Sequence, residues 1–179
     1  MPPLAGRDDA VRAVKHACTG SIGEEHFVAH HYFGGANGTV MRGGTFLELG
    51  ANDGLASNTL YLEQCLEWRG ILIEGQPDTY ELLRKNRPST LALGTAICPK
   101  HGFVNFTQRG SGGDATAGIK TLMDHMHIRR WRLGRVNEIA VPCGPLGDWL
   151  KMLHIGHIDF FSLDVEVHPL CAPAPLCPV

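Results

Sequence analysis

The sequence predicts an α/β protein with a doubly wound and mostly parallel sheet. Two short apolar runs, residues 45–49 and 71–73, are each followed by a segment with helical periodicity. A glycine-rich turn follows the first run, and a third apolar run follows the second helical segment. Strand, helix, strand, helix and strand in succession are typical of a parallel sheet with helices on both faces. The 179 residues are enough for one such domain with a buried core.

Each expected element has a local signal. The run 45–49 is short, apolar and bounded by glycines, which favours a buried strand. Apolar residues at three- and four-residue spacing over 57–68 predict a helix that ends at Gly70. Pro77 begins a second helix that ends before Pro88. The other expected elements are helices over 8–33, 119–127 and 146–153, strands over 71–73, 90–98, 103–107, 139–141 and 158–165, a glycine-rich connector over 34–44 and a loop over 110–118.

Composition and charge argue against several classes of protein. The net charge is −2, which is unlike a general polyanion binder. The basic run from Arg129 to Arg135 is interpreted as a solvated face, so no nucleic-acid partner is expected. The histidines have no cysteine or carboxylate partners at zinc spacing, so no metal site is expected.

The compartment is predicted from weaker signals. No apolar run approaches the roughly 20 residues needed to span a bilayer, so no membrane span is expected. Residues 1–9 lack the pattern of a secretory signal, which makes a cytoplasmic location the default expectation. The six cysteines form no CxxC pair. In a chain without a signal peptide we expect them to be reduced thiols.

The segment from Glu48 to Gly54 carries the clearest chemical signal. It lies at an expected strand-to-helix turn, where glycine allows a positive φ and a close approach of a ligand. Glu74 ends the next expected strand, and a carboxylate there can accept hydrogen bonds from both hydroxyls of a ribose. An acidic strand end, a glycine turn and a second acidic strand end therefore predict a site for a nucleoside cofactor.

Two kinds of nucleoside cofactor are considered, a dinucleotide and S-adenosylmethionine. A dinucleotide site uses a G-x-G-x-x-G turn that opens a helix N-terminus to a pyrophosphate. The turn here lacks the middle glycine, and Asp53 would repel a pyrophosphate. S-adenosylmethionine carries a sulfonium and an ammonium and no phosphate, so nearby acids contribute charge-assisted hydrogen bonds of about 1.5–3 kcal/mol each. The electrostatics favour S-adenosylmethionine, and an NAD-dependent oxidoreductase is the less favoured alternative.

The motifs around this turn resemble those of the FkbM methyltransferase family. The resemblance runs from about Gly44 to Glu166, with a variable middle. It implies a Rossmann-like, class I methyltransferase fold and methyl transfer from S-adenosylmethionine, commonly to a hydroxyl oxygen of a natural product or a sugar. The residues that carry it are Gly50-Ala51-Asn52-Asp53-Gly54, Ser57-Asn58-Thr59, the segment from Trp68 to Glu74, Asn86-Arg87 and the segment 158–166.

The resemblance also implies roles for individual residues. Four are expected to line the methionine end of the cofactor: Glu48, Gly50, Asn52 and Asp53. Three positions support the turn or hold the ribose: Ser57 and Asn58 for the turn, and Glu74 for the ribose. Two acids are expected to face the cofactor from the fourth strand: Asp164 and Glu166. A hydroxyl acceptor needs a general base nearby. Asp164 is the first candidate for this base and His157 the second.

Residues 167–179 depart from the family pattern. They contain four prolines, at the point where the family continues with glycine, a small residue and another acid. We therefore expect a lead-in over 1–43, a methyltransferase domain over 44–166 whose sheet is incomplete after the fourth core strand, and a proline-rich tail. An exposed fourth strand favours self-association. A second hypothesis follows, in which the chain binds S-adenosylmethionine without turnover and acts as an interaction module.

Overall fold

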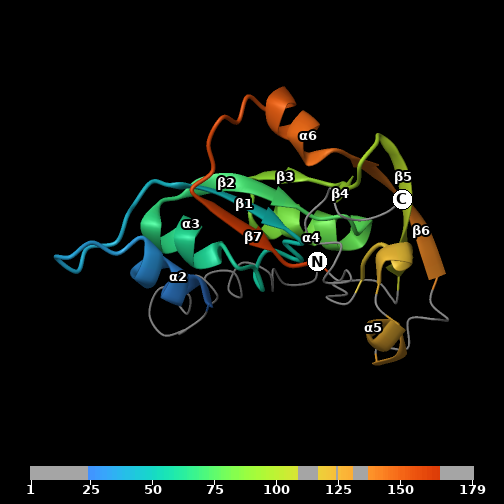
Figure 1. The fold of residues 1–179 in the computed structure, drawn as a ribbon, viewed down its shortest axis with the longest axis horizontal. Helices are drawn as coiled ribbons and strands as arrows, with labels where there is room; N and C mark the ends of the chain where they lie inside the picture. Colours follow the sequence, from blue (N-terminus) through green and yellow to red (C-terminus); the bar gives the residue numbers. More distant parts are fainter. Residues whose placement is uncertain (1–23, 109–116, 124, 131–136, 166–179) are drawn as a thin grey trace, which may run out of the picture.

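The computed structural model describes residues 24–108, 117–123, 125–130 and 137–165 (Figure 1). Its central sheet has four parallel strands in the order β3-β2-β1-β7. They are β1 (Thr45–Leu49), β2 (Arg69–Ile73), β3 (Leu91–Leu93) and β7 (Phe160–Leu163). Strands β2 and β3 lie on one side of β1, and β7, which follows them in the chain, lies on the other side. Such a reversal is the switch point of a Rossmann-like sheet, where ligands bind beyond the carboxyl ends of the strands.

Helices cover both faces of this sheet (Figure 1). Those around it are α2 (Glu24–Tyr32), α3 (Leu60–Leu66), α4 (Pro77–Asn86) and α6 (Leu146–Met152). Phe46 of β1 packs in one core layer with Leu62 of α3 and Leu83 of α4. The next residue, Leu47, packs in a second layer with Leu146 of α6. Successive strand residues point to opposite faces, so one apolar strand supplies both layers. The expected doubly wound α/β fold is confirmed.

A second, smaller sheet lies beside the first and has the order β4-β6-β5. Its strands are β4 (Ala96–Ile97), β5 (Gly102–Gln108) and β6 (Asn137–Gly144). The expectation of one strand over 90–98 is wrong, because the chain leaves the first sheet after Leu93 and enters the second at Ala96. Between them, a Cβ on Gly94 would lie 2.8 Å from the ring of Tyr80. That close approach lets the backbone turn over α4 on its way to β4.

Strand β6 continues through Pro142, although the sequence placed the end of this strand before that proline. Pro142 pairs with Phe103 of β5 on one side. On the other side, β4 pairs only with Cys143 and Gly144. Proline has no N–H to donate, and it is tolerated in a strand where one edge lacks a ladder partner.

Helix α3 is shorter at both ends than the sequence indicates. It begins at Leu60, not 57, because the hydroxyls of Ser57 and Thr59 bind Glu48. It ends at Leu66 and is capped by Glu67, which adopts a left-handed conformation with φ 60° and donates its N–H to the carbonyl of Leu62. Gly70, the expected end of the helix, is the second residue of β2 and lies against Phe46.

Other expected elements differ in extent. The expected helix over 119–127 is a 3₁₀ turn (Lys120–Leu122) and the short helix α5 (His125–Arg130). The last strand covers four residues where eight were expected. Of the expected helices over 8–33, the described part is α2. Most of the expected loop over 110–118 lies outside the described residues.

The expectation of reduced cysteines is wrong. Cys98, just after β4, forms a disulfide with Cys143 of β6. Cys65 of α3 is also disulfide-bonded. Disulfides are typical of oxidising compartments, and the cytoplasmic location stays a prediction. None of the helices in the described ranges has the length and apolar character needed to cross a membrane.

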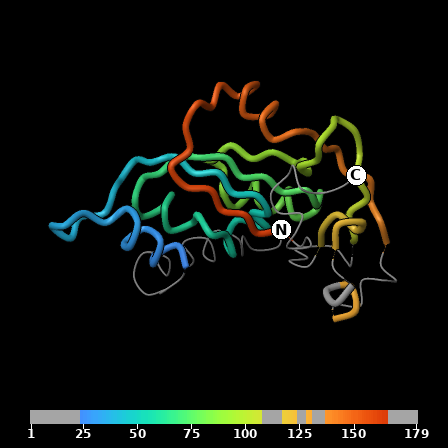
Figure 2. Tube along the Cα trace, viewed as in Figure 1, coloured from blue at the N-terminus to red at the C-terminus, as the bar shows by residue number. Residues whose placement is uncertain are grey.

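Strand β7 is the last strand on its side of the central sheet within the described residues. It runs alongside β1, as the orange-red and cyan segments of Figure 2 show. Phe161 and Leu163 share a face with Leu47, yet they are 46% and 42% exposed. An exposed apolar edge of this kind was expected, and the self-association inferred from it stays a prediction. The expected domain boundaries stay predictions too, although Ala29 of α2 packs in the same core as β1.

Candidate functional site

The candidate site lies at the carboxyl ends of β1, β2 and β7, where the chain turns after β1. Gly50 begins this turn with φ 87°, and its N–H donates to the carbonyl of Ile73 at 2.9 Å. A Cβ on Gly50 would lie only 1.8 Å from the carbonyl oxygen of Asp164. Glycine is therefore required here twice, for its conformation and for the close approach of the β7 end.

Glu48, the fourth residue of β1, is buried beneath the turn with 1% of its surface exposed. One carboxylate oxygen accepts from the hydroxyls of Ser57 and Thr59, both at 2.6 Å. The other oxygen accepts from the N–H of Asn58 at 2.7 Å. Burial raises the pKa of Glu48 above its ordinary value of 4.5, while these hydrogen bonds and the charge of Arg87 act in the opposite direction.

These contacts give Glu48 a role in shaping the site. All three of its donors belong to the segment 57–59, so the carboxylate ties that segment to the end of β1. The sequence placed Glu48 at the methionine end of a cofactor, whereas its carboxylate is occupied by the chain itself. Ser57 and Asn58 both contact this carboxylate, and their role in supporting a cofactor-binding turn stays a prediction.

Glu74, one residue after β2, is the second buried carboxylate. It accepts from the backbone N–H of Asn52 at 3.0 Å and of Gln76 at 2.8 Å, and a third backbone hydrogen bond comes from Gly75. Burial raises the pKa of Glu74 above 4.5, and the neighbouring charge of Glu48 raises it further. Two carboxylate oxygens offer about four acceptor positions, so Glu74 keeps capacity for a ligand hydroxyl.

The middle of the turn is fixed by its own polar groups. Asn52 adopts a left-handed conformation with φ 49°. The carboxylate of Asp53 accepts from the N–H groups of Leu55 at 2.9 Å and Ala56 at 3.1 Å. The side-chain amide of Asn86, at the end of α4, donates to the carbonyl of Asp53 at 2.8 Å. The residues expected to form the turn are therefore brought together.

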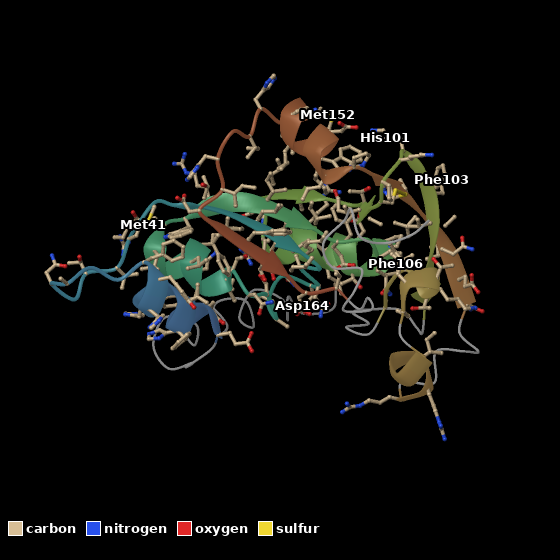
Figure 3. All side chains as sticks on the ribbon, viewed as in Figure 1. Met41, His101, Phe103, Phe106, Met152 and Asp164 are labelled. Atoms are coloured by element: carbon tan, nitrogen blue, oxygen red, sulfur yellow. A yellow bond between two sulfur atoms is a disulfide. The ribbon has the colours of Figure 1, made fainter. Side chains whose placement is uncertain are left out.

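Two features at this site were missed by the sequence interpretation. Arg87 was quoted only as part of a motif, yet its guanidinium is buried beneath the turn and donates to Gly54 and Ser57. Phe106 of β5 packs on Gly75, since a Cβ there would lie 2.5 Å from its ring. Figure 3 labels Phe106 on β5 and Asp164 at the end of β7. In the sequence, Arg87 precedes Pro88 and therefore indicates only the end of a helix. No local pattern in β5 indicates that Phe106 packs on Gly75.

A pocket of about 370 Å³ opens beside the turn. Its lining includes Asn58, the end of β7 and the first turn of α2. The amide of Asn58 lies 3.5 Å from a carboxylate oxygen of Asp164, which is exposed. The acids on the α2 side are Glu24 and Glu25. Asp164 therefore reaches both the turn and a space large enough for a small molecule.

His157, the second candidate base, lies at the other end of the sheet. Its imidazole is 2.7 Å from Asp159, whose carboxylate binds the N–H and hydroxyl of Thr45 at the start of β1. The backbone N–H of Thr45, followed by His157, lowers the pKa of Asp159 to about 2. The structure therefore does not bring His157 to the site. Glu166 lies outside the described residues.

Several buried polar atoms near the turn lack a hydrogen-bond partner, and they indicate whether the site could bind a nucleoside. Among the described residues, the Oδ1 atom of Asn52, both amide atoms of Gln76 and the hydroxyl of Thr79 are buried without a hydrogen-bond partner. Unsatisfied buried groups are uncommon in folded proteins and call for an explanation such as a bound ligand. They flank Glu74, so the residues present fit a polar ligand at this edge. No cluster of three potential metal ligands occurs in the part of the chain that the structure describes.

The fold and this acid-flanked turn together define a Rossmann-like methyltransferase. The family model of the methyltransferase FkbM domain matches residues 48–167, so the chain belongs to that family. The matched region begins at Glu48 and includes Glu74 and Asp164. No curated protein and no solved structure matches the chain.

Proposed function

We propose that this protein transfers a methyl group from S-adenosylmethionine to a hydroxyl oxygen of a small molecule or sugar. One observation carries the proposal: Glu48, near the end of β1, and Glu74, just after β2, are buried at the carboxyl ends of adjacent parallel strands beside a glycine turn. Glu48 shapes the turn, and Glu74 retains acceptor capacity at the position where a ribose would lie. Family membership supports methyl transfer as the reaction.

The charges at the turn favour a cationic cofactor over a dinucleotide. The site contains buried Glu48 and Glu74, with Asp53 in the turn itself. A pyrophosphate would meet these acids and would lack the middle glycine that lets it approach the backbone. A sulfonium is attracted by the same acids, because Coulomb energies are larger where water is excluded.

Different residues of the site would contact different parts of the cofactor. Glu74 would accept one ribose hydroxyl, and Gln76 and Thr79 would offer their unpartnered polar groups to the base. Asn52 and Asp53 in the turn, with Asp164 across from Gly50, would face the methionine end. When bound, S-adenosylmethionine supplies a methyl group on a positively charged sulfur. The chain itself holds the acceptor in line with that methyl group, and positioning of this kind lowers a barrier by several kcal/mol.

Asp164 is the proposed general base. Its carboxylate is exposed at the pocket beside Asn58, within reach of an acceptor hydroxyl placed there. Deprotonation of the hydroxyl during attack increases its nucleophilicity, and the proton passes to the Asp164 carboxylate.

The test is a methyl-transfer assay with S-adenosylmethionine and a panel of sugars and small alcohols, read out as formation of S-adenosylhomocysteine. Turnover that depends on one class of hydroxyl acceptor supports the proposal. Binding of S-adenosylmethionine without turnover on any acceptor favours instead a cofactor-binding module. Tight binding of NADH with no binding of S-adenosylmethionine contradicts both.

A further inference from the structure

The guanidinium of Arg87 is the main polar support underneath the turn that follows β1. Arg87 follows α4 directly and is 1% exposed. One terminal nitrogen donates to the carbonyl of Gly54 at 3.1 Å and to the hydroxyl of Ser57 at 3.0 Å. The other lies 3.4 Å from the hydroxyl of Thr59. One buried cation therefore contacts three polar groups of the turn, which are one backbone carbonyl and two side-chain hydroxyls.

Glu63 of α3 fixes the orientation of that cation. Its carboxylate accepts from the Nε of Arg87 at 2.6 Å and also forms an ion pair with a terminal nitrogen. The hydroxyl of Thr90 donates to the same carboxylate oxygen at 2.5 Å. Arginine presents its donors in a rigid planar fork, so Glu63 on one edge determines where the other donors point.

The network continues from the turn to β1. Ser57 and Thr59, which contact Arg87, are the residues whose hydroxyls donate to Glu48. Two hydroxyls therefore lie between a buried cation and a buried carboxylate, and they link the end of α4 to the end of β1. The charges that face Glu48 in this region are Arg87 and Glu74.

The packing at Gly54 also depends on Arg87. A Cβ on Gly54 would lie 2.7 Å from the Cγ of Arg87 and 2.7 Å from a methyl of Leu83. The backbone of the turn thus lies directly on the aliphatic stem of Arg87. The adjacent Asn86 binds Asp53 from the same end of α4.

We propose that Arg87 is a positioning residue, which holds the segment 52–59 in the conformation that accepts the cofactor. This inference rests on the proposed function. Arg87 is not expected to touch the cofactor, because its donors are directed to Gly54, Ser57 and Glu63. Loss of its fork would release the turn while leaving the strands of the sheet in place.

The first test needs no cofactor and uses hydrogen exchange on the full chain. In Arg87→Lys the charge remains and the fork is lost. We expect the amide of Asn58 to exchange about tenfold faster or more, because its bond to Glu48 depends on the fixed segment. The amide of Leu72, in the middle of the sheet, should exchange at the wild-type rate. Arg84→Lys is the matched control, since Arg84 lies in the last turn of α4, close to Arg87 in the sequence, and its side chain is 57% exposed.

A second pair of variants keeps the test decisive if Arg87→Lys does not fold. Thr59→Val is isosteric and removes the hydroxyl between Arg87 and Glu48. Thr90→Val is isosteric and removes a contact to Glu63 that involves no group of the segment 52–59. By calorimetry with S-adenosylhomocysteine, we expect Thr59→Val and Arg87→Lys to weaken binding about tenfold or more, and Thr90→Val to change it by less than about threefold.

The outcomes separate this inference from the proposed function. Wild-type protein that fails to bind S-adenosylhomocysteine overturns the proposed function, whereas the exchange test still decides the role of Arg87 in the turn. A uniform loss of protection across turn and sheet in Arg87→Lys would make Arg87 merely structural and would overturn the inference. Wild-type affinity in folded Arg87→Lys and Thr59→Val would overturn it as well.

Discussion

Gly50 and Asp164 meet so closely that the Cα of one faces the carbonyl oxygen of the other with no space for a side chain. The two residues are 114 positions apart in the sequence, and the pairing of Leu49 with Leu163 brings them together. This contact joins the turn after β1 to the end of β7 at the switch point of the sheet. The turn that is proposed to bind the cofactor and the candidate base are therefore held in one fixed relation.

Gly50→Ala should destabilise the protein severely. The new Cβ would lie 1.8 Å from the Asp164 carbonyl oxygen, and Gly50 has φ 87°. We expect a loss of at least about 2 kcal/mol in the free energy of unfolding, measured with urea. The control is Gly38→Ala, where φ is 77° but no atom lies within 4 Å of the added Cβ. Equal losses in the two variants would show that the contact with Asp164 is unimportant.

Glu74→Gln should weaken binding of S-adenosylmethionine by about 10- to 100-fold, as loss of a charge-assisted hydrogen bond implies. The amide keeps the size of the side chain but replaces an acceptor oxygen with a donor group. Isothermal titration calorimetry checks this, with Glu81→Gln on the exposed face of α4 as control. Wild-type affinity in Glu74→Gln would remove Glu74 from the binding site.

Asp164→Asn should separate binding from turnover. The amide cannot take a proton, so the methyl-transfer rate should fall by about 10²–10⁴-fold, the usual contribution of a general base. Affinity for S-adenosylmethionine should fall less, by about tenfold, because only one of the acids expected at the methionine end is lost and the backbone contact with Gly50 is kept. Steady-state rates and calorimetry on the same sample measure the two effects. A variant that retains the wild-type rate would exclude Asp164 as the base.

The two buried acids should make stability fall as pH rises. Burial raises the pKa of Glu48 and of Glu74 above 4.5, so the folded chain binds protons that the unfolded chain releases. Their contribution is fully present below pH 4.5 and is lost as pH rises through the folded pKa values. Asp159, with a pKa of about 2, acts in a separate window: its contribution is present above pH 3.8 and is lost as pH falls through 2.

Urea unfolding of the wild type and Glu74→Gln from pH 4.5 to 8 measures the effect of the two buried acids on stability. The variant should show a weaker fall in the free energy of unfolding with rising pH, because one of the two groups no longer titrates. The same slope in both proteins would contradict the raised pKa of Glu74.

The disulfide between Cys98 and Cys143 should stabilise the second sheet. Removing it in Cys98→Ala with Cys143→Ala should cost about 2–4 kcal/mol, the usual range for a bridge closing a loop of this size. Mass spectrometry after alkylation, with and without reductant, tests whether the bond is present in the native protein. Free thiols at both positions in the unreduced protein would contradict it.

The sequence predicted the central sheet because its signals are local. Residues 45–49 form an apolar run that ends in a glycine turn, and Pro77 begins α4 where expected. The break between β3 and β4 was missed because apolar residues flank Gly94 and Thr95, and the separation depends on packing against Tyr80. The roles of Glu48 and Arg87 could not be predicted, because each depends on hydrogen bonds across the folded turn.

His157 illustrates the same limit. Its place before the last strand made it a candidate base, but the amino ends of parallel strands lie opposite the ligand-binding edge. Its contact with Asp159 caps the start of β1 through Thr45. Only the direction and pairing of β7 reveal which end of the strand a residue occupies.

The central claim is that the turn between Glu48 and Glu74 binds S-adenosylmethionine. Calorimetry on the folded chain with S-adenosylmethionine, S-adenosylhomocysteine and NADH tests it most directly. We expect one-to-one binding of the first two, a rise in melting temperature when they are in excess, and no binding of NADH. No heat of binding and an unchanged melting temperature with S-adenosylmethionine, in a sample shown to be folded, would contradict the claim.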